Sequence, residues 1–314
     1  MKILIVDKIH DILIEKLSNA GYFCDYKPKI TALEIEENIS QYHGLIIRSK
    51  TKITKHIIDK AFSLKFIGRV GAGLENIDVA YAESKGIVCF NSPEGNRDAV
   101  GEQAVGMLLM LANNLYNAHK QVCNGIWQRE QNRGWEIKGK TVGIIGFGNM
   151  GRAFAQRLMG FDCRIIAYDK YKTGFSNKYV SECTMNEIFN ETDILSLHVP
   201  LTSETNYLVN NEYINKFHKN IVVINTSRGQ VVNTAELVEN LKTGKIKGAA
   251  LDVLEYESIT FENLFSSDIP EPLRFLAQSN NVVLSPHIAG WTHESNMKLS
   301  AVIADKIVEH FGNK

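Results

Sequence analysis

The chain has 314 residues, with 35 lysine and arginine side chains against 35 aspartate and glutamate side chains. This length is enough for two domains with separate cores, and the balanced charge argues against a nucleic acid or an anionic membrane as the partner. The five cysteines are scattered without CxxC spacing and the first apolar run ends at Asp7, so we predict a soluble cytoplasmic protein with no disulfide framework, no metal site and no membrane segment.

The first ninety residues alternate short apolar runs with polar segments of helical length. The apolar runs are 2–6, 22–26, 44–48, 64–68 and 86–90, and the helical segments between them are 11–20, 31–39, 54–62 and 76–84. This alternation is typical of βα units, which build a parallel sheet with helices on both faces. We therefore predict a small parallel α/β domain in this part of the chain.

A second series of such units begins near Lys140. Before it, 91–96 has the composition of a turn and the apolar segment 99–115 has the length of a helix, so we place a domain boundary there. A closing helix is predicted to start at Thr292 or His293. Both series together predict an α/β fold with two doubly wound parallel sheets. The predicted strands of the second series are 141–146, 163–169, 193–199, 220–227, 246–253 and 281–287, and its predicted helices are 149–159, 184–190, 210–216 and 233–242.

Three glycines follow the first strand of this second series in G-x-G-x-x-G spacing. Gly146 allows a tight turn, Gly148 lets the backbone approach a pyrophosphate, and Gly151 lets the next helix pack closely on the strand. The next strand ends in Asp169, whose carboxylate can accept hydrogen bonds from a ribose diol and would repel a 2′-phosphate. A glycine-rich turn with a capping aspartate is the alternative interpretation. We predict NAD as the cofactor, and note that the neighbouring Lys170 weakens the preference over NADP.

Polar residues follow three other strands of this series, at the edge where doubly wound sheets bind ligands. They include Arg228, Glu257 and His287. An imidazole can take a hydroxyl proton, a carboxylate can fix its tautomer, and a guanidinium can grip a substrate carboxylate while a nicotinamide takes the hydride. Singly, each residue is more simply a surface, loop or capping residue, and Glu255 is an alternative acid. Together they predict hydride transfer at a 2-hydroxy acid, with Pro286 restricting the backbone that carries the imidazole.

Seven segments spread over nearly the whole chain carry a family resemblance. They are GLIIRSKTKIT, FIGRVGAGLENID, VGIIGFGNMG, VPLTSETNYLVN, VINTSRGQVVN, AALDVLEYE and LSPHIAGWT. With these segments the sequence resembles the D-isomer-specific 2-hydroxyacid dehydrogenases, and it is most similar to their phosphoglycerate dehydrogenase branch. The resemblance implies an NAD-dependent oxidoreductase.

The resemblance also implies roles for individual residues. Arg228 would anchor the substrate, Glu257 would lie behind the imidazole, and His287 would be the acid/base. The residues implied to contact the substrate elsewhere are Arg48 and Ser49, at its distal end, and the backbone of Val70, Gly71 and Ala72, at its carboxylate. The residues implied to contact the cofactor are Gly146, Gly148, Asn149, Met150, Gly151, Asp169, His198, Pro200, Thr205, Thr226, Ser227, Arg228, Asp252, His287 and Gly290.

The family resemblance further implies a discontinuous domain organisation. Residues 1–97 and 289–314 would form a flavodoxin-like substrate-binding domain, and 98–288 would form a Rossmann NAD-binding domain inserted into it. The segment 102–135 would make a homodimer through the NAD-binding domain. Ordinary core packing of a long apolar helix is the alternative interpretation of that segment.

Two features depart from the family pattern. Ser258 stands where a proline usually follows the catalytic glutamate, and the excursion 258–281 before the histidine is long. This excursion either reshapes the mouth of the cleft or decorates the surface, and we favour decoration. The chain ends at Lys314 without the regulatory domain of some relatives, so we expect no serine feedback through such a domain.

Several substrates fit this interpretation. Arg48 suits a distal anion, which favours 3-phosphoglycerate and its keto form, 3-phosphohydroxypyruvate, in serine biosynthesis. Reduction of glyoxylate or hydroxypyruvate comes second, and oxidation of erythronate 4-phosphate third. A corepressor-like interaction protein that senses NAD(H) is an alternative from a different class.

Overall fold

The structure is a computed structural model that describes residues 1–257 and 269–312. It divides into two compact units. One unit comprises Met1–Arg97 and Trp291–Lys314, and the other comprises Asp98–Gly290, so that the second interrupts the first along the chain. We refer to them as the five-stranded unit and the seven-stranded unit, after their sheets.

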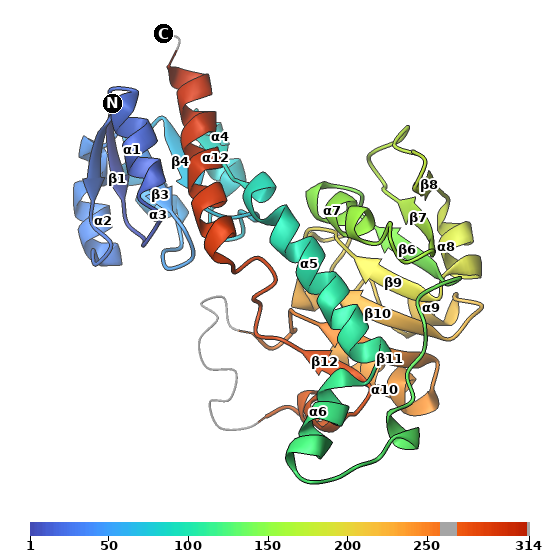
Figure 1. Cartoon of the computed structure of the whole chain (residues 1–314). Helices are drawn as coiled ribbons and strands as arrows, with labels where there is room; N and C mark the ends of the chain where they lie inside the picture. The colour runs from blue at the N-terminus through green and yellow to red at the C-terminus, as the bar shows by residue number, and fades with distance from the viewer. Residues whose placement is uncertain (258–268, 313–314) are drawn as a thin grey trace. The chain divides into compact units, whose positions relative to one another are not determined.

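The five-stranded unit is a parallel sheet with helices on both faces (Figure 1). Its strand order, β2-β1-β3-β4-β5, is that of a flavodoxin-like sheet. Helices α1 and α12 cover one face, and helices α2, α3 and α4 cover the other. The elements are β1 (Lys2–Ile5), α1 (Ile12–Asn19), β2 (Phe23–Tyr26), α2 (Ala32–Asn38), η1 (Ile39–Gln41), β3 (Gly44–Ile47), α3 (Lys55–Lys60), β4 (Phe66–Arg69), α4 (Val79–Ser84), β5 (Val88–Phe90) and α12 (His293–Phe311).

Two features of the sequence explain how helix α12 forms and packs in this unit: a capping motif at its start and an apolar face. The Thr292 side chain accepts a hydrogen bond from the Ser295 N–H, and the Ser295 hydroxyl oxygen accepts one from the Thr292 N–H. This capping box fixes the first turn of the helix. Farther along, Leu299, Ile303 and Ile307 are buried against the sheet. The predicted start of the closing helix is therefore confirmed.

The seven-stranded unit is also fully parallel, with strand order β12-β11-β10-β9-β6-β7-β8. The first strand of the unit, β6, lies between β7 and β9, so the strand order reverses beside it as in a Rossmann fold. Helices α5 and α7 cover one face, and α8, α9, α10 and α11 cover the other. The elements are α5 (Pro93–Ala112), α6 (Leu115–Cys123), η2 (Glu130–Asn132), β6 (Thr141–Ile145), α7 (Asn149–Arg157), β7 (Arg164–Tyr168), β8 (Val180–Glu182), α8 (Met185–Glu191), β9 (Ile194–Leu197), α9 (Asn211–Asn215), β10 (Ile221–Asn225), η3 (Gly229–Val231), α10 (Thr234–Thr243), β11 (Ile246–Leu251), α11 (Glu271–Gln278) and β12 (Val282–Leu284).

The predicted fold class is confirmed, and one local prediction is wrong. Residues 93–96 were expected in a turn, but they form the first turn of α5. Proline is compatible with the first position of a helix because the N–H that it lacks has no partner there. Gly95 then lets this turn pack closely, since a Cβ built on it would lie 2.5 Å from the Leu299 nitrogen of α12.

The excursion 258–281 is described only in part. Residues 258–268, and with them Ser258, lie outside the described residues. The remainder includes α11, whose Leu273 and Leu276 are buried in the core of the seven-stranded unit. That helix is therefore part of the core and not surface decoration.

None of the described helices has the length and apolar character needed to cross a membrane.

Candidate active site

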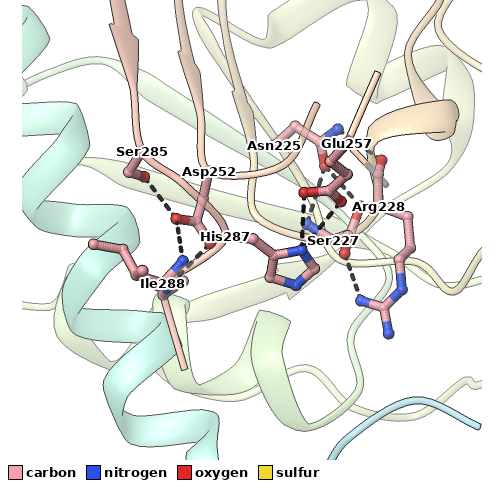
Figure 2. A network of polar contacts seen from close by, with 9 residues as sticks. Asn225, Ser227, Arg228, Asp252, Glu257, Ser285, His287 and Ile288 are labelled. Atoms are coloured by element: carbon pink, nitrogen blue, oxygen red, sulfur yellow. Dashed lines mark hydrogen bonds and ion pairs between the residues drawn. The ribbon is translucent and has the colours of Figure 1, made fainter. Parts of the chain in front are cut away.

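The polar residues that follow β10, β11 and β12 lie at one edge of the seven-stranded sheet. The register pairs Asn225 with Leu251 and Leu251 with Leu284, so the three strands end at the same level. Because neighbouring parallel strands present their carboxyl ends to the same edge, the residues beyond them gather there. Figure 2 shows this group of side chains.

The imidazole of His287 and the carboxylate of Glu257 form the central pair. His287 Nδ1 lies 3.1 Å from both Glu257 Oε1 and Oε2, and the two side chains are 25% and 16% exposed. A carboxylate can only accept, so a neutral imidazole that bonds it carries its proton on Nδ1. Nε2 is then the nitrogen that can exchange a proton with a ligand.

The backbone at His287 has an unusual conformation. Its φ angle is +54°, in the left-handed region that residues other than glycine seldom adopt. Its N–H donates to the Asp252 carbonyl at 2.7 Å and to the Ser285 carbonyl at 3.0 Å. Such a conformation costs about 1–3 kcal/mol and persists where the surroundings fix it. The rigidity expected from Pro286 is therefore supplemented by a constrained φ angle at the histidine itself.

Asp252 supplies much of that constraint. It is 1% exposed, and its Oδ1 accepts hydrogen bonds from the Ser285 hydroxyl at 2.6 Å and the Ile288 N–H at 2.9 Å. Its Oδ2 accepts one from the Ala289 N–H at 2.9 Å. The carboxylate thus holds the turn on both sides of His287, a role that the sequence did not reveal. The contact with NAD implied for Asp252 by the family resemblance stays a prediction.

Glu255, the alternative acid, has other partners. Its Oε1 accepts from the Tyr207 hydroxyl at 2.7 Å and its Oε2 accepts from the Thr234 N–H at 3.0 Å. It therefore links the start of α10 to the loop after β9. Of the two glutamates that follow β11, Glu257 is the one that contacts the histidine ring.

Arg228 lies in a loop whose side chains form hydrogen bonds with the backbone of the same loop. Asn225 donates to the Arg228 carbonyl at 2.9 Å and accepts from the Ser227 N–H at 3.0 Å and the Ser227 hydroxyl at 2.7 Å. The Arg228 Nη1 donates to the Ser227 carbonyl at 2.6 Å. A Cβ on Gly229 would lie 2.0 Å from the Leu254 carbonyl oxygen, so only glycine lets this loop approach the loop that bears Glu257. The contacts of Asn225 and Gly229 were not predicted from the sequence, because they depend on the conformation of this loop and of the loop that follows β11.

The glycine loop between β6 and α7 fits a dinucleotide. Gly146 has a φ angle of +89°, and a Cβ on Gly151 would lie 2.1 Å from the Gly146 carbonyl oxygen. Gly148 differs from both, since a Cβ there would meet only the Lys172 ammonium nitrogen, at 3.6 Å. The space above Gly148 can therefore accept a pyrophosphate next to the helix N-terminus, where Asn149 and Met150 begin α7.

Asp169 lies beside this loop at the end of β7. Its Oδ2 accepts from the Phe147 N–H at 2.8 Å, and its Oδ1 accepts from the N–H groups of Tyr171 and Lys172 at 3.0 and 3.1 Å. Two carboxylate oxygens offer about four acceptor positions, so the side chain retains capacity for a ribose hydroxyl. Lys170 forms an ion pair with Glu204 at 2.7 Å, which offsets its charge next to Asp169.

The loop after β9 contains the other residues expected near the cofactor. Burial lowers the pKa of His198 to about 3, so its imidazole is neutral at physiological pH, and its Nε2 lies 2.8 Å from the Ser196 hydroxyl. Thr205 donates to the Pro200 carbonyl at 2.5 Å. In the neighbouring loop after β10, the buried hydroxyl of Thr226 has no hydrogen-bond partner among the described residues, and a ligand or water normally satisfies such a group. Gly290 is the last residue of the seven-stranded unit.

The residues predicted to bind substrate through the five-stranded unit follow β3 and β4. Arg48 is half-buried after β3, and Ser49 follows it. The Val70 N–H donates to Ile47 at 2.8 Å, and the Gly71 N–H donates to the Arg69 carbonyl and to the Ser92 hydroxyl. The Ala72 N–H is the one of the three without an acceptor among the described residues.

Comparison with known proteins identifies the family. Residues 105–289 match the family model described as D-isomer specific 2-hydroxyacid dehydrogenase, NAD binding domain. The chain belongs to this family. The predicted cofactor, NAD, is the one that the family description names, and the match spans most of the seven-stranded unit.

Individual relatives support the same assignment. The chain is 33% identical over 310 residues to a D-3-phosphoglycerate dehydrogenase of Archaeoglobus fulgidus, covering 98% of this chain and 57% of that protein. It is 37% identical over 281 residues to a hydroxypyruvate reductase of Thermotoga maritima, covering 89% and 88%. The chain thus spans little more than half the length of the first relative. Among solved structures, D-lactate dehydrogenase from Aquifex aeolicus, complexed with NAD and lactic acid, has a TM-score of 0.83 at 26% identity, covering 99% of this chain and 95% of that one.

Proposed function

We propose that the protein interconverts a D-2-hydroxy acid and its 2-keto acid with NAD, and that 3-phosphoglycerate and 3-phosphohydroxypyruvate, in serine biosynthesis, are its substrate pair. The observation that supports the reaction is the His287–Glu257 pair at the ligand-binding edge of a dinucleotide fold. When bound, NAD accepts the hydride from the hydroxyl-bearing carbon, or donates it in the reverse direction as NADH.

The side chains of the protein provide the rest of the chemistry. We propose that His287 Nε2 takes the proton of the substrate hydroxyl during oxidation and returns it during reduction. Glu257 holds the ring by its Nδ1 and stabilises the imidazolium when it forms. Arg228 binds the carboxylate of the substrate through charge-assisted hydrogen bonds. We also propose that the Ala72 N–H contacts that carboxylate.

The choice of substrate rests on Arg48. A guanidinium binds a phosphate monoester well because two N–H groups can contact two oxygens at once. The relatives include both phosphoglycerate dehydrogenases and reductases named for hydroxypyruvate and glyoxylate, so these smaller acids are the second candidate. Erythronate 4-phosphate remains a third.

A spectrophotometric assay tests the enzyme assignment. Purified protein with NADH is mixed with 3-phosphohydroxypyruvate, hydroxypyruvate and glyoxylate, and absorbance of NADH is followed. We expect turnover with all three and the highest kcat/KM for the phosphorylated acid. Tight NADH binding without turnover of any acid would contradict the proposal and favour a corepressor-like NAD(H) sensor.

We also propose a homodimer formed through the seven-stranded unit, and a cytoplasmic location. Helix α6 has no buried residue, and Leu115, Tyr116, Val122 and Trp127 are exposed on and after it. An apolar group of this kind on a soluble protein marks an interface. We expect wild-type protein to have twice the mass of one chain in light scattering and Trp127→Glu to lower that mass. Phe62→Glu, which changes an exposed ring of the five-stranded unit, is the control.

A further inference from the structure

Arg48 is held from two sides by residues that are distant in the sequence. Its guanidinium carbon lies 4.3 Å from the centre of the Trp291 ring, and its Nη1 donates to the Asn296 side-chain oxygen at 3.0 Å. Both partners belong to the segment that starts α12, within the same five-stranded unit. The capping box at Thr292 fixes the helical turn from which Asn296 projects.

The backbone of Arg48 is fixed as well. Its N–H donates to Asp7 Oδ2 at 2.5 Å. Its carbonyl accepts from Arg69 Nε at 3.1 Å and from the Asn76 side-chain amide at 3.2 Å. Backbone and side chain are therefore both restrained, and the guanidinium has a defined position before any ligand arrives.

The charge of this guanidinium is not neutralised by an ion pair with any described carboxylate. Asp7 is 5% exposed, and one of its carboxylate oxygens accepts the hydrogen bond from the Arg48 N–H. Burial lowers the pKa of Arg48, and the charge of Asp7 opposes that effect. By contrast, Arg157 in the other unit pairs with Asp98 at 2.8 Å. A half-buried cation without an ion-pair partner is costly and is a common feature of an anion-binding site.

The chemical nature of the two contacts explains how such a site can work. An aromatic ring that packs its face against a guanidinium orients it without neutralising the positive charge. A carboxylate in the same place would compete with an incoming anion. Asn296 takes one N–H of Nη1. The edge formed by Nε and Nη2 has no partner among the described residues. That edge has the geometry to bind two oxygens of one anion.

We propose that Trp291 and Asn296 are positioning residues, which aim Arg48 at a second anionic group of the substrate and so select 2-hydroxy acids that carry one. This inference rests on the proposed function and names residues that determine its specificity. A phosphate monoester and a carboxylate share the required chemistry. Comparing the kinetics of a substrate with a distal phosphate and a substrate with a distal carboxylate distinguishes the two groups.

Steady-state kinetics with NADH tests the inference. The substrates are 3-phosphohydroxypyruvate, oxaloacetate with a distal carboxylate, and hydroxypyruvate with a distal hydroxyl. For Trp291→Ala we expect kcat/KM for the phosphorylated acid to fall about 3- to 30-fold, the range of a partly desolvated cation–π contact. The loss should lie in KM, with hydroxypyruvate changed less than about twofold. A larger loss for oxaloacetate than for the phosphorylated acid would identify the carboxylate as the preferred distal group.

Conservative variants separate positioning from a merely structural role. Trp291→Phe keeps a ring beneath the guanidinium and should retain most of the preference, whereas Asn296→Ala should lose part of it. Phe62→Ala removes an 87% exposed ring of the same unit and should change nothing. In an Arg48→Gln background, Trp291→Ala should have no further effect, because its contribution passes through the arginine. Equal losses for all three substrates, or additive effects of the two substitutions, would overturn the inference.

A binding measurement keeps this test separate from the proposed reaction. Isothermal titration compares the affinities of 3-phosphoglycerate and glycerate for wild-type protein and Trp291→Ala. If no acid turns over but Trp291→Ala weakens 3-phosphoglycerate more than glycerate, the positioning inference stands and the proposed reaction fails. If turnover occurs and the two ligands weaken alike, the reaction stands and the inference fails.

Discussion

Two ionisable side chains, His287 and Arg48, each lie just beyond a parallel strand, but they are restrained in different ways. In the seven-stranded unit, a carboxylate contacts the imidazole on one nitrogen and a second carboxylate fixes its turn. In the five-stranded unit, a ring and an amide contact the guanidinium, and no carboxylate of the described residues forms an ion pair with it. A proton carrier needs a fixed tautomer, whereas an anion receptor needs its charge available. The contrast fits our proposal that the proton-transfer pair lies in one unit and the receptor for the distal anion lies in the other.

The largest effect is expected from His287→Ala. Loss of a general acid/base lowers rates by about 10²- to 10⁴-fold, and we expect kcat to fall in this range for phosphorylated and unphosphorylated acids alike. Fluorescence titration should give nearly unchanged NADH affinity. A variant that keeps a tenth of the wild-type kcat would show that another group carries the proton.

A smaller loss is expected from Glu257→Gln, because the ring remains but its orienting carboxylate does not. We expect kcat to fall about 10- to 100-fold, less than general acid/base removal. Glu255→Gln is the matched control, since that acid follows the same strand and contacts Tyr207 instead. Equal losses in both variants, measured with the same keto acid, would mean that the pairing with His287 is not the source of the effect.

Arg48→Gln should separate the two regions most clearly. We expect kcat/KM for 3-phosphohydroxypyruvate to fall about 10-fold or more, as one charge-assisted contact contributes about 1.5–3 kcal/mol. Activity on hydroxypyruvate should change little. If both acids were affected alike, Arg48 would serve the fold or the common carboxylate, and the division between chemistry and recognition would not hold.

The smallest effect concerns stability and His198. Its pKa falls from an ordinary value of 6.5 to about 3 on folding because of burial. Between these pH values the unfolded chain binds more protons than the folded one, so the free energy of unfolding decreases as the pH falls below 6.5. For wild-type protein this residue should contribute a loss of about 1–2 kcal/mol between pH 7 and pH 5. Urea unfolding of His198→Gln should show a shallower decrease, and an identical decrease would contradict the assignment.

The predictable parts of the molecule are those with a short-range sequence signal. Apolar alternation located most strands, and glycine spacing located the dinucleotide loop. Strand β8 was not predicted because its three residues, at the edge of the sheet, are too few to show an alternation. Helix α6 was not predicted either, and it buries no side chain. The Arg48–Trp291 contact could not be predicted, because it joins distant positions through side chains alone. The hydrogen bonds that the Asp252 carboxylate accepts from the Ser285 hydroxyl and from the N–H groups of Ile288 and Ala289 also join distant positions and could not be predicted.

The hydrogen bonds of Asp252 also bear on whether the length of the segment between Glu257 and His287 affects the site. Glu257 follows β11, and His287 is tied to β11 through the carbonyl and carboxylate of Asp252. The register between Leu251 and Leu284 sets the distance between the two strand ends. The separation of acid and base is therefore determined at the sheet and not by the number of residues that connect them. We expect changes in the number of residues between Glu257 and α11 to leave the contact between Glu257 and His287 intact, provided that Leu273 and Leu276 of α11 keep their places in the core.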